Sequence, residues 1–183
     1  RVNKERLEWF ERVLAVVREP NRHTMAAPRG VDADDALVPV DAGGLFTHLL
    51  CYVGALVALG ASEDACVRMR GQPAQSCVAE RTLAERLTRG CGALYDPRTS
   101  AAGFAPESAW IHAANEPIDV RDASFNLRPE YVESVWAMHA LTNSSRYRDE
   151  VLRVHEALHR WCRTTSGGYS GLRDVRDPEG QGK

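Results

Sequence analysis

The amino-acid sequence lacks several features that would place it in a special class of proteins. No apolar run is long enough to cross a bilayer. The net charge is −2, and no basic run or basic–aromatic interleaving is present, so a polyanionic partner such as nucleic acid is not indicated. No repeat of fixed period is visible, which argues against a regular solenoid. With 183 residues, 44% of them hydrophobic, the chain is long enough for one globular domain with a core.

The Cys-x-x-Cys spacing of zinc and redox sites is also missing. The cysteines are Cys51, Cys66, Cys77, Cys91 and Cys162. They could be buried thiols in a reducing compartment, or one or two disulfides with a cysteine left over, and composition leaves both readings open. Asn143-Ser144-Ser145 is an N-glycosylation sequon, which matters only for a protein of the secretory pathway.

Apolar residues recur at helical spacing in five segments, which predicts an all-α fold. The expected helices cover residues 4–17, 45–61, 78–94, 129–141 and 147–161. The stretches between them contain proline and glycine without periodicity and are predicted to be loops, and residues 166–170 predict a tight turn or short hairpin. Loops of such length are uncommon in a compact bundle but are expected where helix connections build a pocket.

Charged side chains lie close together at the start of one expected helix. The segment is residues 125–134, with the sequence Phe-Asn-Leu-Arg-Pro-Glu-Tyr-Val-Glu-Ser. Pro129 suits the first helical position. Glu130 and Glu133 are three residues apart and share a helix face, where the positive N-terminus helps to keep both ionised. Together with Arg128 they could supply a general base and part of a cation shell. The same residues in isolation could equally form a solvated helix start.

This segment resembles the Leu-Arg-Pro-Glu-x-Val-Glu-Ser signature of glycoside hydrolase family 47, the class I α-1,2-mannosidases. Further segments resemble the family's other motifs in the same order, so that the resemblance extends from about residue 4 to residue 175. These segments are His48-Leu49-Leu50-Cys51-Tyr52 through Ala58-Leu59-Gly60, then residues 87–91, 103–107 and 146–148, and Ser166-Gly167-Gly168-Tyr169-Ser170 through Asp174-Val175.

The resemblance implies both a fold and an activity. Family members are (α/α)7 barrels that remove α-1,2-linked mannose from N-glycans with inversion and require Ca2+. Inverting hydrolysis uses two carboxyl groups, roughly 6.5–9.5 Å apart, with a water between one of them and the sugar. The implied partner is a high-mannose N-glycan or glycoprotein, and the implied location is the lumen of the endoplasmic reticulum or Golgi.

A role for each matching residue follows from the same resemblance. Glu130 is implied to be the base that activates the water, and Arg128 and His48 are implied to bind the sugar. Glu107 and Glu133 are implied to hold waters of the calcium shell. The Thr-Glu motif that supplies the family's direct calcium ligand has no counterpart in the sequence.

The resemblance also bears on the cysteines. Cys51 and Cys91 match the family's disulfide pair, which favours an oxidising compartment. Cys66 and Cys77 lie outside that pattern and could form a further local bridge, leaving Cys162 over. Their pairing stays open from the sequence.

Three departures from the family pattern qualify these expectations. Thr47-His48 stands where the family has Asp-His, and Gly54-Ala55 where it has Pro-Gly. The family's proton donor has no match here either. We therefore expect residues 1–183 to be a partial catalytic domain, truncated at both ends and inactive by itself, with any membrane anchor outside it.

Two alternatives to an enzyme remain compatible with the sequence. A mannosidase-like lectin or quality-control factor would bind high-mannose glycoproteins without efficient hydrolysis. A helical scaffold would have no sugar site at all. The intact Arg128, Glu130 and Glu133 favour the enzyme, because a scaffold has no need for carboxylates beside an arginine.

Overall fold

The computed structural model describes residues 36–112 and 117–180, together with residues 8, 10–12, 15 and 24–26. Helices dominate this part of the chain: α2 (Val53–Gly60), α3 (Val78–Leu94), α4 (Glu130–Thr142) and α5 (Ser145–Ala157). The shorter helical turns are the 3-10 turns His48–Tyr52 and Ala74–Cys77 and the π-helical turns Ala65–Met69 and Leu158–Cys162. No helix of the described residues is long and apolar enough to cross a membrane.

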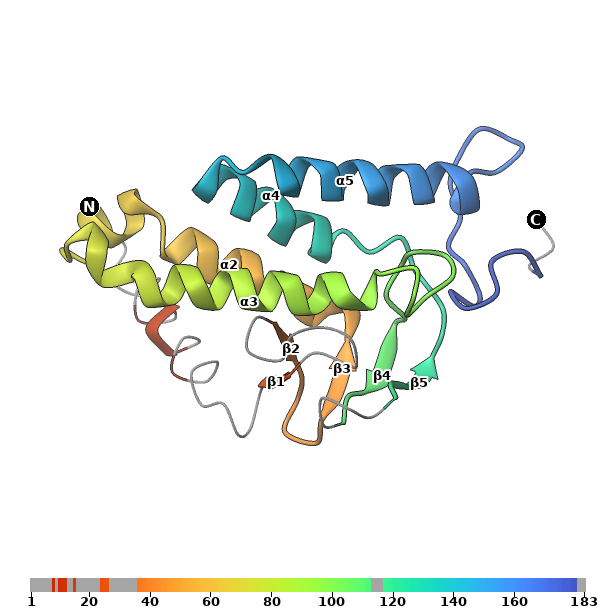
Figure 1. The fold of residues 1–183 in the computed structure, drawn as a ribbon, viewed down its shortest axis with the longest axis horizontal. Coiled ribbons are helices and arrows are strands. Elements are labelled where there is room, and N and C mark those ends of the chain that lie inside the picture. The colour runs from red at the N-terminus through yellow and green to blue at the C-terminus, as the bar shows by residue number, and fades with distance from the viewer. Residues whose placement is uncertain are drawn as a thin grey trace.

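Within the described residues, five short strands accompany the helices and form two antiparallel sheets. The first sheet pairs β1 (Thr24–Ala26) with β2 (Leu37–Pro39). The second has the order β3-β4-β5, with β3 (Leu45–Thr47), β4 (Ser108–Trp110) and β5 (Asp119–Asp122). Helix α2 packs against α3 and α4, and α4 packs against α5, while the strands gather on the other side of α3 (Figure 1).

Helix α4 carries the expected motif and is built around one buried face. Tyr131, Ser134, Val135 and Met138 recur at spacings of three and four, and all four are buried. The helix ends at Asn143, which adopts a left-handed conformation with φ of 54°. This burial fixes how α4, and therefore its first residue, Glu130, sits against α2 and α3.

One buried hydroxyl joins α4 to the turn that precedes α2. Ser134 Oγ donates to the carbonyl of Cys51 at 2.5 Å and accepts from the amide of Ala55 at 2.8 Å, so the side chain inserts into the backbone hydrogen-bond ladder. A Cβ on the neighbouring Gly54 would lie 2.6 Å from Thr88 Oγ1 on α3. The small residue therefore allows α2, α3 and α4 to approach closely at this point.

The prediction of a single helix over residues 45–61 is wrong at its start. Residues Leu45–Thr47 form β3, which pairs in register with Ser108–Trp110, and α2 begins only at Val53 after a 3-10 turn. A continuous apolar run does not distinguish a buried strand from a buried helix, and strand pairing decided between them here. The loops expected between the helices likewise contain the other four strands.

The N-terminal helix expected over residues 4–17 lies largely outside the described residues. Those that are described, residues 8, 10–12 and 15, are helical. The ring of Phe10 lies against α2, because a Cβ on Gly60 would meet its Cζ at 1.9 Å. At the other end of the chain, the hairpin expected near residue 168 is present as a bridge between Arg163 and Tyr169.

Two disulfides fasten the helices. Cys51–Cys91 joins the 3-10 turn before α2 to α3, with Cα atoms 5.6 Å apart. Cys66–Cys77 joins the two helical turns between α2 and α3, with Cα atoms 6.4 Å apart. Cys162 is buried in the core. The first bridge is the one that the family resemblance implied, and the second decides a pairing that the sequence had left open.

Candidate active site

Four polar side chains from three segments converge at the N-terminus of α4. We call His48, Glu107, Arg128 and Glu130 the site cluster. His48 Nδ1 lies 3.5 Å from Glu130 Oε2, and Arg128 Nη1 lies 4.0 Å from Glu130 Oε1. Arg128 also forms an ion pair with Glu107 through its Nη2. The four residues span 83 positions of sequence and meet because β3 pairs with β4 and the 3-10 turn after β3 packs against α4.

Backbone hydrogen bonds fix the segments that carry these four side chains. The amide of His48 donates to the carbonyl of Glu107 at 3.0 Å, just beyond the paired strands β3 and β4. Phe125 exchanges two backbone hydrogen bonds with Leu172, each 2.9 Å long, and so anchors the loop before α4. Leu127 then turns the chain with a φ of 55°, which is strained for a residue with a side chain. The strained turn leads directly into Arg128.

Both oxygens of the Glu107 carboxylate accept hydrogen bonds. Arg128 Nε donates to Glu107 Oε2 at 3.2 Å, Asn126 Nδ2 donates to the same oxygen at 3.0 Å, and Arg128 Nη2 reaches the other oxygen. Partial burial raises the pKa of Glu107, but these hydrogen bonds outweigh it and hold the pKa below its usual value. Glu107 is therefore an anion that fixes the guanidinium of Arg128 in place.

His48 is wholly buried and packs its ring against Phe46, Tyr95 and Phe125. Its Nε2 lies 2.6 Å from the hydroxyl of Tyr95. Burial, which outweighs the opposing charges of Glu130 and Glu107, lowers the pKa of His48. The ring is therefore neutral at neutral pH.

Two atoms of the site cluster are left without a hydrogen bond. His48 Nδ1 and Glu130 Oε2 are both buried, and neither has a partner among the described residues. Their separation of 3.5 Å is at the outer limit of a hydrogen bond. Buried polar groups are nearly always satisfied, and exceptions are concentrated at functional sites. The pair thus marks the point where this cluster is ready to engage another molecule.

Glu133 lies apart from the site cluster. It is exposed on α4, and within the described part of the chain no hydrogen bond or ion pair joins its carboxylate to the other four side chains. Nor do the described residues contain a group of three or more His, Cys, Asp or Glu that could hold a metal ion. The described residues thus offer no direct ligand set for Ca2+, and the role of Glu107 and Glu133 in holding calcium-bound water stays a prediction.

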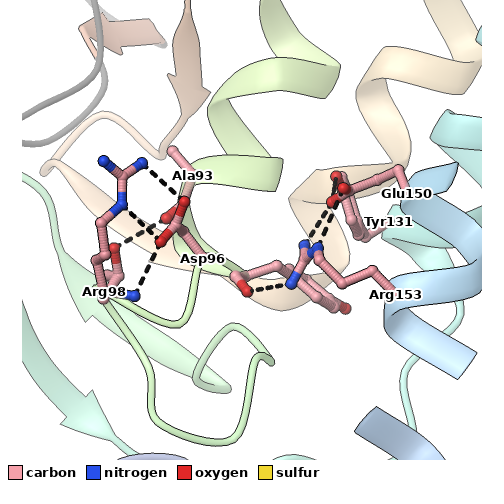
Figure 2. Close-up of polar contacts among 8 residues, drawn as sticks. Ala93, Asp96, Arg98, Tyr131, Glu150 and Arg153 are labelled. Carbon is pink, nitrogen blue, oxygen red and sulfur yellow. Dashed lines mark hydrogen bonds and ion pairs between the residues drawn. The ribbon is translucent and has the colours of Figure 1, made fainter. Parts of the chain in front are cut away.

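A second arginine–glutamate cluster lies at the interface of α4 and α5 (Figure 2). This support cluster comprises Tyr131, Glu150 and Arg153. Tyr131 Oη donates to Glu150 Oε1 at 2.5 Å, and Arg153 donates to Glu150 through Nε at 3.1 Å and Nη2 at 2.5 Å. Arg153 Nη1 also donates to the carbonyl of Tyr95 at 2.8 Å. A cavity of about 450 Å³ borders this cluster and includes no residue of the site cluster.

Three residues that shape the site were not predicted from the sequence. Tyr95 contacts His48 from the end of α3, 47 residues away, and no local pattern signals such a contact. Ser134 lies within the recognised motif, but its bonds to the turn after His48 require the packed helices. Asn126 directly precedes the Leu-Arg-Pro-Glu run, and that position is the one signal that pointed to it.

Comparison with known proteins shows what the chain is similar to. Residues 12–183 match the sequence model of Glycosyl hydrolase family 47. Human mannosyl-oligosaccharide 1,2-alpha-mannosidase IB is 33% identical over 130 residues, which cover 70% of this chain and 19% of that protein. The pig enzyme IA is 35% identical over 139 residues, covering 73% and 19%.

A solved structure shares the fold. The alpha-1,2-mannosidase from Trichoderma reesei matches with a TM-score of 0.62 and 20% identity over 81% of this chain and 32% of that one. The mostly helical chain is thus part of an (α/α)7 barrel, and the expected all-α class is confirmed. This chain spans about a fifth of the length of the curated relatives. By its sequence and its fold, the chain belongs to glycosyl hydrolase family 47.

Proposed function

We propose that the protein containing this chain removes α-1,2-linked mannose from N-glycans by inverting hydrolysis. The observation that carries the proposal is the carboxylate of Glu130, which lies between His48 and Arg128 at the start of α4 in a member of family 47. The human and pig relatives are named mannosyl-oligosaccharide 1,2-alpha-mannosidases, which supports the same substrate class.

Each residue of the site cluster receives a role from its contacts. Glu130, at the positive end of α4, acts as the base that takes a proton from the attacking water. Arg128 binds sugar hydroxyls with its planar guanidinium, which Glu107 and Asn126 hold in orientation through the shared carboxylate. His48 forms the buried wall of the site and faces Glu130.

The proton donor of the reaction comes from outside the site cluster. A general acid needs a raised pKa, whereas the ion pair with Arg128 keeps the pKa of Glu107 low. We infer that residues 1–183 are part of a longer catalytic domain and are inactive alone, since the chain covers about a fifth of its relatives.

Calcium dependence is a further part of the proposal for the intact protein. The described residues offer no direct ligand set, so the roles above include no step through the metal. Glu107 and Glu133 are proposed only as acceptors for waters of the ion. The two disulfides support a lumen of the secretory pathway as the location, and one human relative is named an endoplasmic reticulum enzyme.

The test uses the intact protein with an α-1,2-linked mannobiose. Replacing Glu130 with Gln removes the base, and we expect kcat to fall by about 10²- to 10⁴-fold. Proton NMR of the first product shows inversion at the anomeric carbon. Glu156→Gln, an exposed site on α5, is the matched control and keeps the rate. Unchanged turnover by Glu130→Gln would refute the base assignment.

One observation favours a second candidate, a mannosidase-like lectin. The site cluster contains no carboxyl group available as an acid, and binding needs none. Such a protein would bind high-mannose glycan in calorimetry, lose affinity in Arg128→Ala, and release no mannose.

A further inference from the structure

The two ring nitrogens of His48 face different partners. Nε2 lies 2.6 Å from Tyr95 Oη, and Nδ1 lies 3.5 Å from Glu130 Oε2. A neutral imidazole carries one proton, so one nitrogen donates and the other accepts. The choice of tautomer therefore decides whether the ring attracts or repels the carboxylate of Glu130.

Tyr95 determines which tautomer fits. Its side chain is completely buried, and burial together with the charge of Glu130 raises its pKa well above the usual value, so the hydroxyl keeps its proton. If Nε2 carried the proton of His48, the hydroxyl proton of Tyr95 would need another acceptor. The lone pair of Nδ1 would then also face an anion. Both conflicts disappear when Tyr95 donates to Nε2 and Nδ1 carries the proton.

We propose that Tyr95 is a positioning residue that fixes His48 as the Nδ1–H tautomer, so that the ring directs its single N–H at Glu130 Oε2. This N–H points at Oε2 from 3.5 Å and leaves Oε1, on the Arg128 side, for the attacking water. The inference rests on the proposed function only in taking Glu130 as the base. Fixing the tautomer of an imidazole beside a catalytic group is an established way to orient it.

Tyr95 is itself held rigidly. Its backbone carbonyl accepts from Arg153 Nη1 at 2.8 Å, and its ring lies 4.3 Å from the ring of Tyr131 between centroids. Both of those residues belong to the support cluster, whose hydrogen bonds Figure 2 shows. A continuous set of contacts therefore runs from the α4–α5 interface through Tyr95 and His48 to Glu130.

The tautomer can be measured without any assay of activity. Long-range proton–nitrogen spectra of ¹⁵N-histidine-labelled intact protein should show His48 with a protonated Nδ1 and a bare Nε2. Tyr95→Phe keeps the ring and removes the donor, and it should shift His48 toward the other tautomer. Tyr147→Phe removes the hydroxyl of another buried tyrosine, at the start of α5, and should leave His48 unchanged. A bare Nδ1 in the wild-type spectrum would overturn the proposal.

Kinetics test the positioning role separately. If Tyr95 orients the base through His48, Tyr95→Phe should lower kcat about ten- to a hundredfold with little change in KM. A rate equal to that of Tyr147→Phe, despite an altered tautomer, would show that the tautomer does not position Glu130. If the wild-type protein shows no hydrolysis, the proposed function fails, while the tautomer result still stands or falls by the spectra.

Discussion

The site cluster and the support cluster contain the same kinds of residue but differ in how completely their polar atoms are hydrogen-bonded. In the support cluster the carboxylate of Glu150 accepts three hydrogen bonds, from Tyr131 and Arg153. In the site cluster Glu107 is equally well engaged, yet Glu130 Oε2 and its neighbour His48 Nδ1 have no partner among the described residues. The support cluster, whose carboxylate is fully hydrogen-bonded, joins two helices. The site cluster has polar atoms that can still bind a ligand.

This difference in hydrogen bonding indicates the functional site more clearly than the types of residue do. Arginines beside glutamates occur in both clusters, and the cavity of about 450 Å³ borders the support cluster. Leaving a buried polar group without a hydrogen bond costs about 1–3 kcal/mol. The unpaired atoms of the site cluster therefore lower the stability of the fold. Site and scaffold should therefore respond to substitution in opposite ways, with activity sensitive in one and stability in the other.

Among substitutions that compare the two clusters, the largest effect is expected from Arg128→Lys. Lysine keeps the charge but cannot reproduce the planar contacts with Glu107, so the cation shifts relative to the sugar. We expect kcat/KM of the intact protein to fall about a hundredfold, while the free energy of unfolding changes by less than about 1 kcal/mol. Arg148→Lys on α5 is exposed and provides the control. An equal loss of stability and activity would erase the distinction between the clusters.

Glu150→Ala tests the role of the support cluster. It leaves Tyr131 Oη and Arg153 without their shared acceptor at the α4–α5 interface. The free energy of unfolding should drop by about 2 kcal/mol in urea titrations, and kcat should change far less than in Arg128→Lys. Asp149→Ala, the exposed neighbour, should leave stability nearly unchanged. If Glu150→Ala abolished activity in the folded protein, the support cluster would belong to the active site.

The two clusters also differ in how far the sequence could predict them. The periodic pattern gave α3 as residues 78–94, its observed bounds, because seventeen residues supply enough period to be read. The five expected site residues were found through motifs of the family, and the structure brings all but Glu133 together; their roles stay predictions. The contact of Tyr95 with His48 needed the packed fold, since no pattern links residues so far apart.

The strands also could not be predicted from the local sequence pattern. Strands of three or four residues carry too little alternation to be recognised, and β3 is continuous with an apolar helix. What sets its conformation is its pairing with β4 and the turn before it, where Asp41 Oδ1 accepts from the amides of Gly43 and Leu45. The placement of His48 directly after β3 thus depends on a partner more than sixty residues away.

The smallest effect is expected where a pair is exposed, at Asp96 and Arg98 near the support cluster (Figure 2). Hydrogen bonds from Arg98 lower the pKa of Asp96 below its usual value. A carboxyl group whose pKa is lower in the folded state stabilises the protein above its unfolded pKa of about 3.9. That contribution is lost as the pH falls through the folded value. Wild type and Asp96→Asn should therefore differ by less than about 1 kcal/mol at pH 7, and the difference should vanish in strong acid. A difference that grew on acidification would contradict the ion pair and place the origin of the effect in the unfolded chain.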